Sequence, residues 1–237
     1  MKKVLFALLA FVALNATAQT KVVTDPNARP RTISGEFTGV SVATGIELFL
    51  TQGDEISLAV SMNDEKYNEG FRTEVENGVL KIWYDNKNKI NWDKGRKLKA
   101  YLSVKTLSKL SASSGADVKI LNQLKVGKFD LRLSSGSEFD GAIIATSLNV
   151  DQSSGSEINL SGTATETSIS VSSGASFDGY SFVTDNCTAS ASSGAEIEIT
   201  ANKSLEASAS SGGSIKYKGT ATNVDITKSS GGSVRKS

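Results

Sequence analysis

A Ser-Ser-Gly triplet occurs seven times in the second half of the chain at nearly constant spacing, and few folds accommodate such a repeat. Successive triplet glycines lie 21, 19, 19, 20, 18 and 19 residues apart. A period of this length indicates stacked structural units, whereas a flexible Ser/Gly linker lacks regular flanking residues. The triplet glycines are Gly115, Gly136, Gly155, Gly174, Gly194, Gly212 and Gly231.

The residues around each triplet alternate between apolar and polar types. The residue five before the glycine and the residue three after it are apolar, whereas the residue four after it is polar in every repeat. The residue directly after the glycine is always small. This period of two predicts half-buried strands on both sides of the triplet. The apolar residues three after the glycine are Val118, Phe139, Ile158, Phe177, Ile197, Ile215 and Val234.

A strand, a tight corner and a second strand within each repeat make one coil of a parallel β-solenoid. Coils stacked about 4.8 Å apart bury the inner faces that no coil can bury alone. Glycine adopts the positive φ of a sharp corner, and serine hydrogen-bonds nearby backbone groups. We therefore predict an all-β, single-chain parallel β-solenoid with coils of about 19 residues, as the triplet spacing requires. An antiparallel β-sandwich of short strands is the alternative.

The N-terminus has the pattern of a secretory signal peptide. Two lysines precede the apolar run VLFALLAFVAL, and Ala16-Thr17-Ala18 follows with small residues at alternate positions. The run is shorter than the roughly 20 residues that span a bilayer, and no second run of that length follows. We predict a signal peptide at 1–18 and an exported protein without a transmembrane span, located in the periplasm, on the outer surface or outside the cell.

The remaining chain divides by the regularity of its alternation. Asn77-Gly78 is a strong hairpin signal between FRTEV and VLKIWY, in a region where the repeat is looser. The predicted segments are an extended leader at 19–30, strands that start and cap the solenoid at 31–110, and the repeat solenoid at 111–237, with 31–237 as one continuous domain.

Composition excludes several classes of chemistry. The sequence has no histidine, which removes Ser-His and Cys-His nucleophile pairs and histidine-ligated zinc. Cys187 is the only cysteine, so no intramolecular disulfide forms. The near-zero net charge gives no reason to expect nucleic acid as a partner. We assign no catalytic residue, metal or cofactor.

The segments outside and inside the repeat together resemble the auto-transporter adhesin head domain family, also called the GIN domain. The resemblance covers about residues 32–236 and runs through FTGVSVATGIELFLTQGDEISLAVSMNDE, FRTEVENGVLKIWYD and LKAYLSVKTLSKLSASSGADVKI before the triplets. It implies an exported bacterial protein that folds as a right-handed parallel β-helix. The family lends no agreed catalytic or binding residues.

One predicted outward column, two residues after the triplet glycine, is rich in carboxylates. Like charges about 5 Å apart repel by around 1 kcal/mol in water, so a cation or a basic partner would stabilise this ladder. A solvated face that resists aggregation is the other interpretation. Calcium takes about six to eight oxygen ligands, which these positions alone do not supply. The ladder residues are Asp117, Glu138, Glu157 and Glu196.

Residues 81–101 contain seven basic residues against two acidic ones, with aromatic residues between them. Aromatic rings beside cations suit an anionic polysaccharide or a lipid headgroup. Lysines that protect an exposed sheet edge are the alternative interpretation. The candidate ligand-binding residues are Trp83, Trp92, Lys94, Arg96, Lys97, Lys99 and Tyr101.

These features favour a non-enzymatic, adhesin-like module of the cell envelope that presents a rigid surface to a glycan or another envelope component. A polysaccharide-degrading β-helix enzyme is one alternative, for which Asp140 and Asp178, at equivalent positions two coils apart, are the available carboxylates. A purely structural, oligomer-forming protein is the other. A solenoid must cover its last coil, and either Arg235 and Lys236 or a second molecule can do so. A homo-oligomer through the solenoid ends is therefore one of two expectations.

Overall fold

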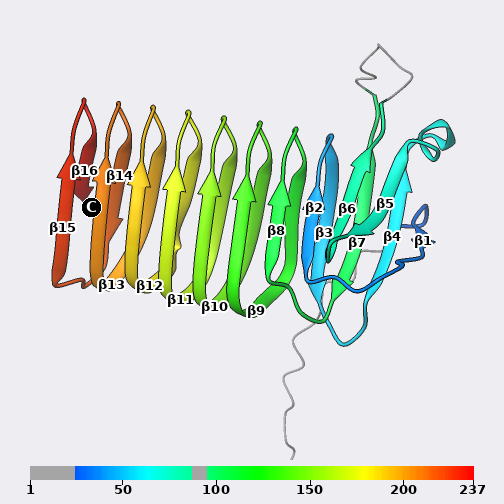
Figure 1. Cartoon of the computed structure of the whole chain (residues 1–237), viewed down its shortest axis with the longest axis horizontal. Helices are drawn as coiled ribbons and strands as arrows, with labels where there is room; N and C mark the ends of the chain where they lie inside the picture. Colours follow the sequence, from blue (N-terminus) through cyan, green and yellow to red (C-terminus); the bar gives the residue numbers. More distant parts are fainter. Residues whose placement is uncertain (1–24, 87–94) are drawn as a thin grey trace, which may run out of the picture.

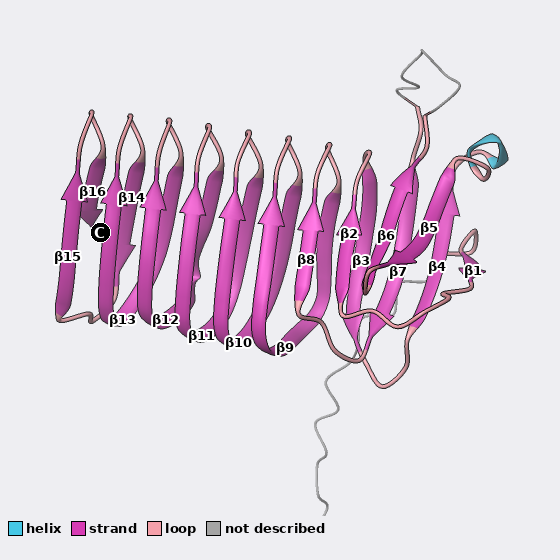
Figure 2. Ribbon diagram, in the orientation of Figure 1, coloured by secondary structure: helices cyan, strands magenta, loops and turns pink. Residues whose placement is uncertain are grey.

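The computed structural model describes residues 25–86 and 95–237, which form a rod of stacked β-strands (Figure 1). Apart from one 3-10 turn, the described elements are strands (Figure 2). The elements are β1 (Arg29–Arg31), β2 (Gly39–Val42), β3 (Ile46–Gln52), β4 (Ser57–Met62), η1 (Glu65–Tyr67), β5 (Phe71–Glu76), β6 (Val79–Tyr84), β7 (Leu98–Val104), β8 (Lys109–Ala112), β9 (Asp117–Leu133), β10 (Glu138–Gln152), β11 (Glu157–Val171), β12 (Ser176–Ala191), β13 (Glu196–Ala209), β14 (Ser214–Lys218), β15 (Asn223–Lys228) and β16 (Ser233–Lys236).

Strands β9 to β13 stack in parallel, each one coil after the last. Phe139 of β10 pairs with Ile158 of β11, and Ile158 pairs with Phe177 of β12. The paired residues are those that the sequence repeat aligns, so the predicted parallel β-solenoid is confirmed. The parallel register also excludes the antiparallel β-sandwich.

Each coil contributes to two layers that enclose one apolar core. Layer A contains β4, β7, β3, β14 and β16, and layer B contains β5, β6, β2, β8 and β15. The long strands β9 to β13 belong to both, because each bends at the edge opposite the corners. Alternate residues point into the core: Ile158 and Phe177 are fully buried, whereas Asn159 and Asp178 are exposed.

The Ser-Ser-Gly triplets form the corners along one edge of the rod. The second serine has φ between 47° and 57° and the glycine between 66° and 77° in all seven copies. Two successive positive φ angles define a type I′ turn. In the first copy the Ala116 N–H closes this turn by donating to the Ser113 carbonyl at 3.2 Å. The Gly115 N–H donates to the Ser135 carbonyl of the next coil at 3.1 Å. Main-chain hydrogen bonds therefore link successive corners.

An eighth corner precedes the repeat at Ala43-Thr44-Gly45, between β2 and β3. Thr44 has φ 62° and Gly45 has φ 71°, and the Gly45 N–H donates to the Ser114 carbonyl at 3.0 Å. The coil of β2 and β3 thus has the same corner geometry as the Ser-Ser-Gly coils.

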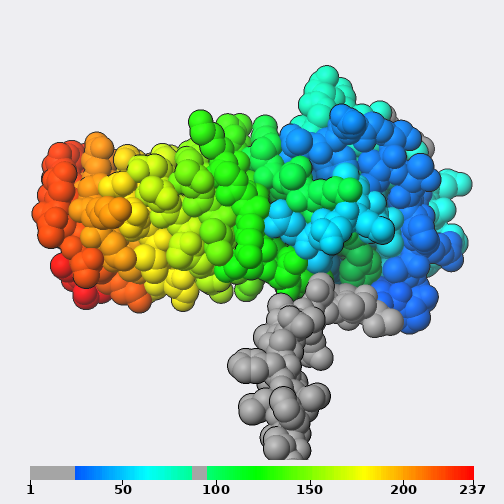
Figure 3. All heavy atoms as spheres, turned by 90° about the horizontal axis from the view of Figure 1, so that it is seen from below, coloured from blue at the N-terminus to red at the C-terminus, as the bar shows by residue number. Residues whose placement is uncertain are grey.

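The N-terminal region stacks its coils out of chain order. Strands β2 and β3 lie between the β6–β7 coil and the β8–β9 coil. Beyond that, β4 pairs antiparallel with β7, and β5 pairs antiparallel with β6 through the predicted Asn77-Gly78 hairpin. The end of the predicted leader supplies β1, which pairs antiparallel with β4. These strands make the N-terminal end broader than the repeat (Figure 3). The predicted signal peptide lies outside the described residues.

Candidate functional site

Three of the seven predicted ligand-binding residues lie together on β7 and just before it. Lys97, Lys99 and Tyr101 line a cleft of about 340 Å³ whose other walls include Asp25 and Asn63. The alternation of β7 explains the grouping, because Leu98, Ala100 and Leu102 are buried in the core and their neighbours point outward. Trp92 and Lys94 lie outside the described residues.

Tyr101 is stacked on an aromatic residue that the sequence interpretation missed. Phe49 of β3 pairs with Tyr101 in register, and the two rings lie 5.1 Å apart between centroids at 12°. The ammonium groups of Lys99 and Lys119 each lie 5.8 Å from the Phe49 ring centroid. We call Phe49, Lys97, Lys99, Tyr101 and Lys119 the aromatic–lysine patch.

Carboxylates balance part of the positive charge of the patch. Glu47 accepts from Lys119 at 2.8 Å and lies 3.9 Å from the Lys99 ammonium, and Asp117 lies 3.0 Å from Lys119. The hydrogen bond from Lys119 to Glu47, followed by that to Asp117, raises the pKa of the Lys119 ammonium. Lys97 forms no ion pair with a carboxylate among the described residues, so its ammonium is the least neutralised of the three.

The cleft also contains an acceptor held in its ionised form. The Tyr101 hydroxyl donates to Asp25 at 2.7 Å. This hydrogen bond, with one from the Asn27 N–H, lowers the pKa of Asp25. Burial, followed by the hydrogen bond to Asp25, raises the pKa of Tyr101. The cleft therefore offers ammonium donors beside a carboxylate at neutral pH.

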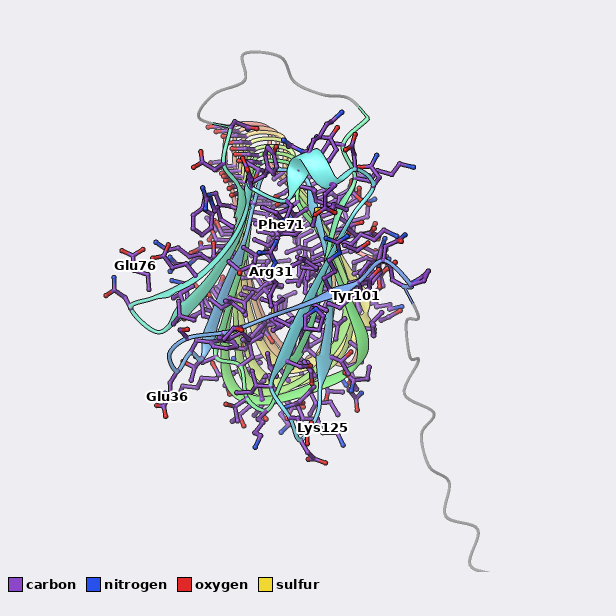
Figure 4. All side chains as sticks on the ribbon, turned by 90° about the vertical axis from the view of Figure 1, so that its right-hand side faces the viewer. Arg31, Glu36, Phe71, Glu76, Tyr101 and Lys125 are labelled. Carbon is purple, nitrogen blue, oxygen red and sulfur yellow. The ribbon has the colours of Figure 1, made fainter. Side chains whose placement is uncertain are left out.

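Two other predicted residues lie away from the patch. Trp83 is half-buried on the outward face of β6, in layer B. Arg96 stacks over the Tyr84 ring at 4.0 Å and donates to the Thr44 carbonyl at 3.2 Å, next to the eighth corner. A view along the rod shows Tyr101 on one side and Glu76 of the β5–β6 hairpin on the other (Figure 4). Trp83 and Arg96 therefore do not join Lys97, Lys99 and Tyr101 in one site.

The acidic ladder occupies one outward column of layer A, in register from coil to coil. Asp117 pairs with Glu138, Glu138 with Glu157, and Ser176 separates Glu157 from Glu196. Lysines neutralise both ends of the column: Lys119 at Asp117, and Lys216 at Glu196 with an Nζ–Oε1 distance of 2.6 Å. Within residues 25–86 and 95–237, no group of three or more His, Cys, Asp or Glu side chains could hold a metal ion.

The carboxylates considered for an enzyme lie on the neighbouring outward column. Asp140 pairs with Asn159, which pairs with Asp178, and both aspartates are exposed. They lie two coils apart, as the repeat predicted, on the outer face of layer A. The side chains of Asp140 and Asp178 are not hydrogen-bonded to each other.

A second hollow, of about 720 Å³, lies in the N-terminal cap and has mainly apolar walls. We call it the apolar hollow. Phe37 and Leu58 are buried beneath it, whereas Ile56 is 49% exposed at its surface. Arg31 and Lys105 contribute the basic groups of its lining.

Two further properties concern the chain as a whole. The part of the chain that the structure describes has no helix long and apolar enough to cross a membrane. Cys187 is a buried core side chain, in register with Leu205, and burial raises the pKa of its thiol to about 12. It is therefore a packing residue.

Comparison with known proteins identifies a family over most of the described chain. The family described as "Putative auto-transporter adhesin, head GIN domain" matches residues 36–221. A comparison with curated proteins returns no match.

Solved structures share the fold at low sequence identity. A putative adhesin from Bacteroides fragilis superposes with a TM-score of 0.79 at 22% identity, covering 89% of this chain and 96% of that one. A putative adhesin from Parabacteroides distasonis superposes with a TM-score of 0.68 at 18% identity. A putative lipid binding protein from the same species superposes with a TM-score of 0.55 at 23% identity. Each of these two comparisons covers 89% of this chain and 96% of the other.

Proposed function

The chain belongs to the auto-transporter adhesin head GIN domain family, and we propose that it is an exported, non-enzymatic binding module that holds an anionic glycan at the aromatic–lysine patch. An adhesin acts by binding, and its partners lie outside the cytoplasm. The observation that carries the proposal is that Lys97, Lys99 and Tyr101 line one cleft beside the Phe49 ring.

The chemistry of the cleft supports a polyhydroxylated, acidic ligand. Lys97 and Lys99 provide cationic donors for a carboxylate or sulfate, and Asp25 provides an acceptor for hydroxyl groups. The apolar surface of Phe49 and Tyr101 packs against the carbon–hydrogen face of a sugar. Because the patch lies on the straight outer face of layer A, a polymer can continue along the rod.

The test is retention of the purified protein on insoluble polysaccharides, both carboxylated and neutral, with new chain ends assayed in the same tubes. We expect retention on the acidic polymers without cleavage, and loss of retention for Lys97→Ala/Lys99→Ala. The matched control is Lys109→Ala/Lys128→Ala, which removes two lysines from the outer face of layer B. Equal retention of both variants would refute binding at the aromatic–lysine patch. New chain ends would identify a polysaccharide-degrading enzyme.

The apolar hollow favours an amphiphile as the second candidate ligand. Ile56 and Leu58 offer apolar contacts for an acyl chain, and Arg31 lies within reach of an acidic headgroup at the wall. One structural relative is itself named a putative lipid binding protein. Binding of a dansylated fatty acid tests this candidate: Ile56→Glu should abolish the fluorescence gain, while Ile144→Glu, at a similarly exposed isoleucine of the repeat, should not.

A further inference from the structure

The C-terminal end of the rod has two strands with open outer edges. Strand β15 pairs with β13 and β16 pairs with β14, and no other described strand pairs with either one (Figure 1). Ile226 of β15 occupies an inward column but is 38% exposed, whereas Ala207, its register partner, is 1% exposed. This end leaves backbone groups and core side chains uncovered.

The opposite end shows how this fold closes a solenoid. There β4 pairs antiparallel with β7 in layer A, and β5 pairs antiparallel with β6 in layer B. Antiparallel strands on both layers therefore finish the parallel stack. At the C-terminal end, the described chain provides no such strands.

We propose that a second copy of this chain covers the C-terminal end, related by a two-fold axis parallel to the strands. Rotation about such an axis exchanges the layers, so β15 of each copy lies against β16 of the other. The two strands of one copy run in opposite directions around the corner, so each new contact is antiparallel. The inference is independent of the aromatic–lysine patch.

The last corner sets the register of this pairing. Ser230 and Gly231 are the two central residues of the turn, so residues at about equal distances before and after them lie at about the same height, and the rotation preserves height. Two registers near this height pair inward residues with inward residues. One places Lys228 against Val234 of the second copy. The other places Ile226 against Val234 and Asp225 against Arg235 of the second copy, and it is favoured because it pairs apolar with apolar and acidic with basic side chains. Ile226 and Val234 are in inward columns, whereas Asp225 and Arg235 are in outward ones, so the register joins core to core.

The charges of the two edges are complementary. The outer face of layer B ends in Glu206 and Asp225, and that of layer A ends in Lys216 and Arg235. Asp225 and Arg235 form no ion pair with other described residues. Like charges would meet if β15 paired with β15 of the second copy around Asp225, which disfavours that arrangement.

Lys228 and Lys236 occupy inward columns at the ends of their strands, where inward-pointing charges can discourage pairing. Both side chains are exposed, and their length lets the ammonium groups reach solvent from the rim. The dimer is thus expected to be weak, with a Kd of about 1–100 µM, because each copy contributes two short edges.

Charge exchange tests the pairing by sedimentation equilibrium. We expect the protein to dimerise, Asp225→Arg and Arg235→Asp each to raise the Kd at least about tenfold, and an equimolar mixture of the two variants to recover it. In the mixture, the heterodimer has both opposite-charge contacts, while each homodimer has two like-charge contacts. The double variant Asp225→Arg/Arg235→Asp should also dimerise.

Asp178→Arg, an equivalent charge reversal in the middle of layer A, is the control and should dimerise like the parent protein. Circular dichroism of each variant establishes that it is folded. A monomeric parent protein would overturn the proposal, showing that the inward lysines keep the end free. A dimer that persists in both single variants, or a mixture that stays monomeric, would also overturn it.

Discussion

Two glycines of one coil allow the energetic contribution of a positive φ to be separated from that of a close approach. Gly155 is the corner glycine, at φ 66°, and an added Cβ there would meet no atom within 4 Å. Gly162 lies at the opposite bend with φ 114°, and its added Cβ would lie 2.0 Å from the Ile143 carbonyl oxygen of the preceding coil. Alanine at Gly155 is therefore only strained, whereas alanine at Gly162 also collides with backbone.

The magnitudes follow from these environments. Gly155→Ala should lower the free energy of unfolding by about 1–2 kcal/mol, the cost of a left-handed non-glycine residue. At Gly162, backbone strain of about 1–3 kcal/mol combines with a similar overpacking term, giving about 3 kcal/mol or more. With a urea m-value of about 3 kcal/mol/M, the midpoints should fall by about 0.5 M and by at least about 1 M, respectively.

Urea unfolding followed by far-ultraviolet circular dichroism measures both midpoints. The comparison is internal, because both residues belong to the coil between β10 and β12 and both variants gain one methyl group. Equal midpoint shifts, or a larger shift for Gly155→Ala, would refute the reasoning, since they would mean that the coils do not approach each other at Gly162.

Three further predictions concern single side chains. Cys187, whose thiol pKa is about 12, should not react with Ellman's reagent in the native protein at neutral pH, and should react fully after unfolding in urea. Tyr101→Phe should remove a hydrogen bond that lowers the pKa of Asp25. The difference in stability between the variant and the parent protein should have its full size above about pH 4, the ordinary pKa of an aspartate. This difference should vanish as pH falls through the lower folded-state pKa of Asp25. Thermal unfolding at a series of pH values measures it. Ser154→Asn should raise the urea midpoint, by about 0.1–0.3 M, because asparagine adopts the left-handed conformation of this corner position more readily than serine, and an unchanged or lower midpoint would contradict this.

The repeat could be predicted from the sequence because a stacked solenoid places equivalent residues in contact. The alternation around Gly155 and Gly174 identifies the inward residues, and the period aligns Ile158 with Phe177 as the hydrogen-bonded register does. Each coil contacts mainly its neighbours, so local pattern and tertiary pairing carry the same information here.

The N-terminal region was harder to interpret because its coils depart from that correspondence. The eighth corner has apolar Val40 five residues before Gly45 and Leu48 three after it, as the repeat requires. It also has Ile46 in place of the small residue after the glycine, which hides the match. The position of β2 and β3 between later strands depends on contacts between distant parts of the chain, which no periodicity reports.

The layer to which a strand belongs also decides which outward residues can act together. Trp83 and Lys99 both point away from the core and lie close in sequence, but the chain passes from layer B to layer A between them. Alternation distinguishes inward from outward residues, and it does not say which layer an outward residue belongs to. Phe49 joins the patch for the converse reason, since out-of-order stacking brings β3 against β7. One outward column runs from Tyr101 through Phe49 to Lys119, and these residues come from three separate segments of the chain. Binding residues in such a solenoid therefore have to be sought along columns of stacked coils and not within windows of sequence.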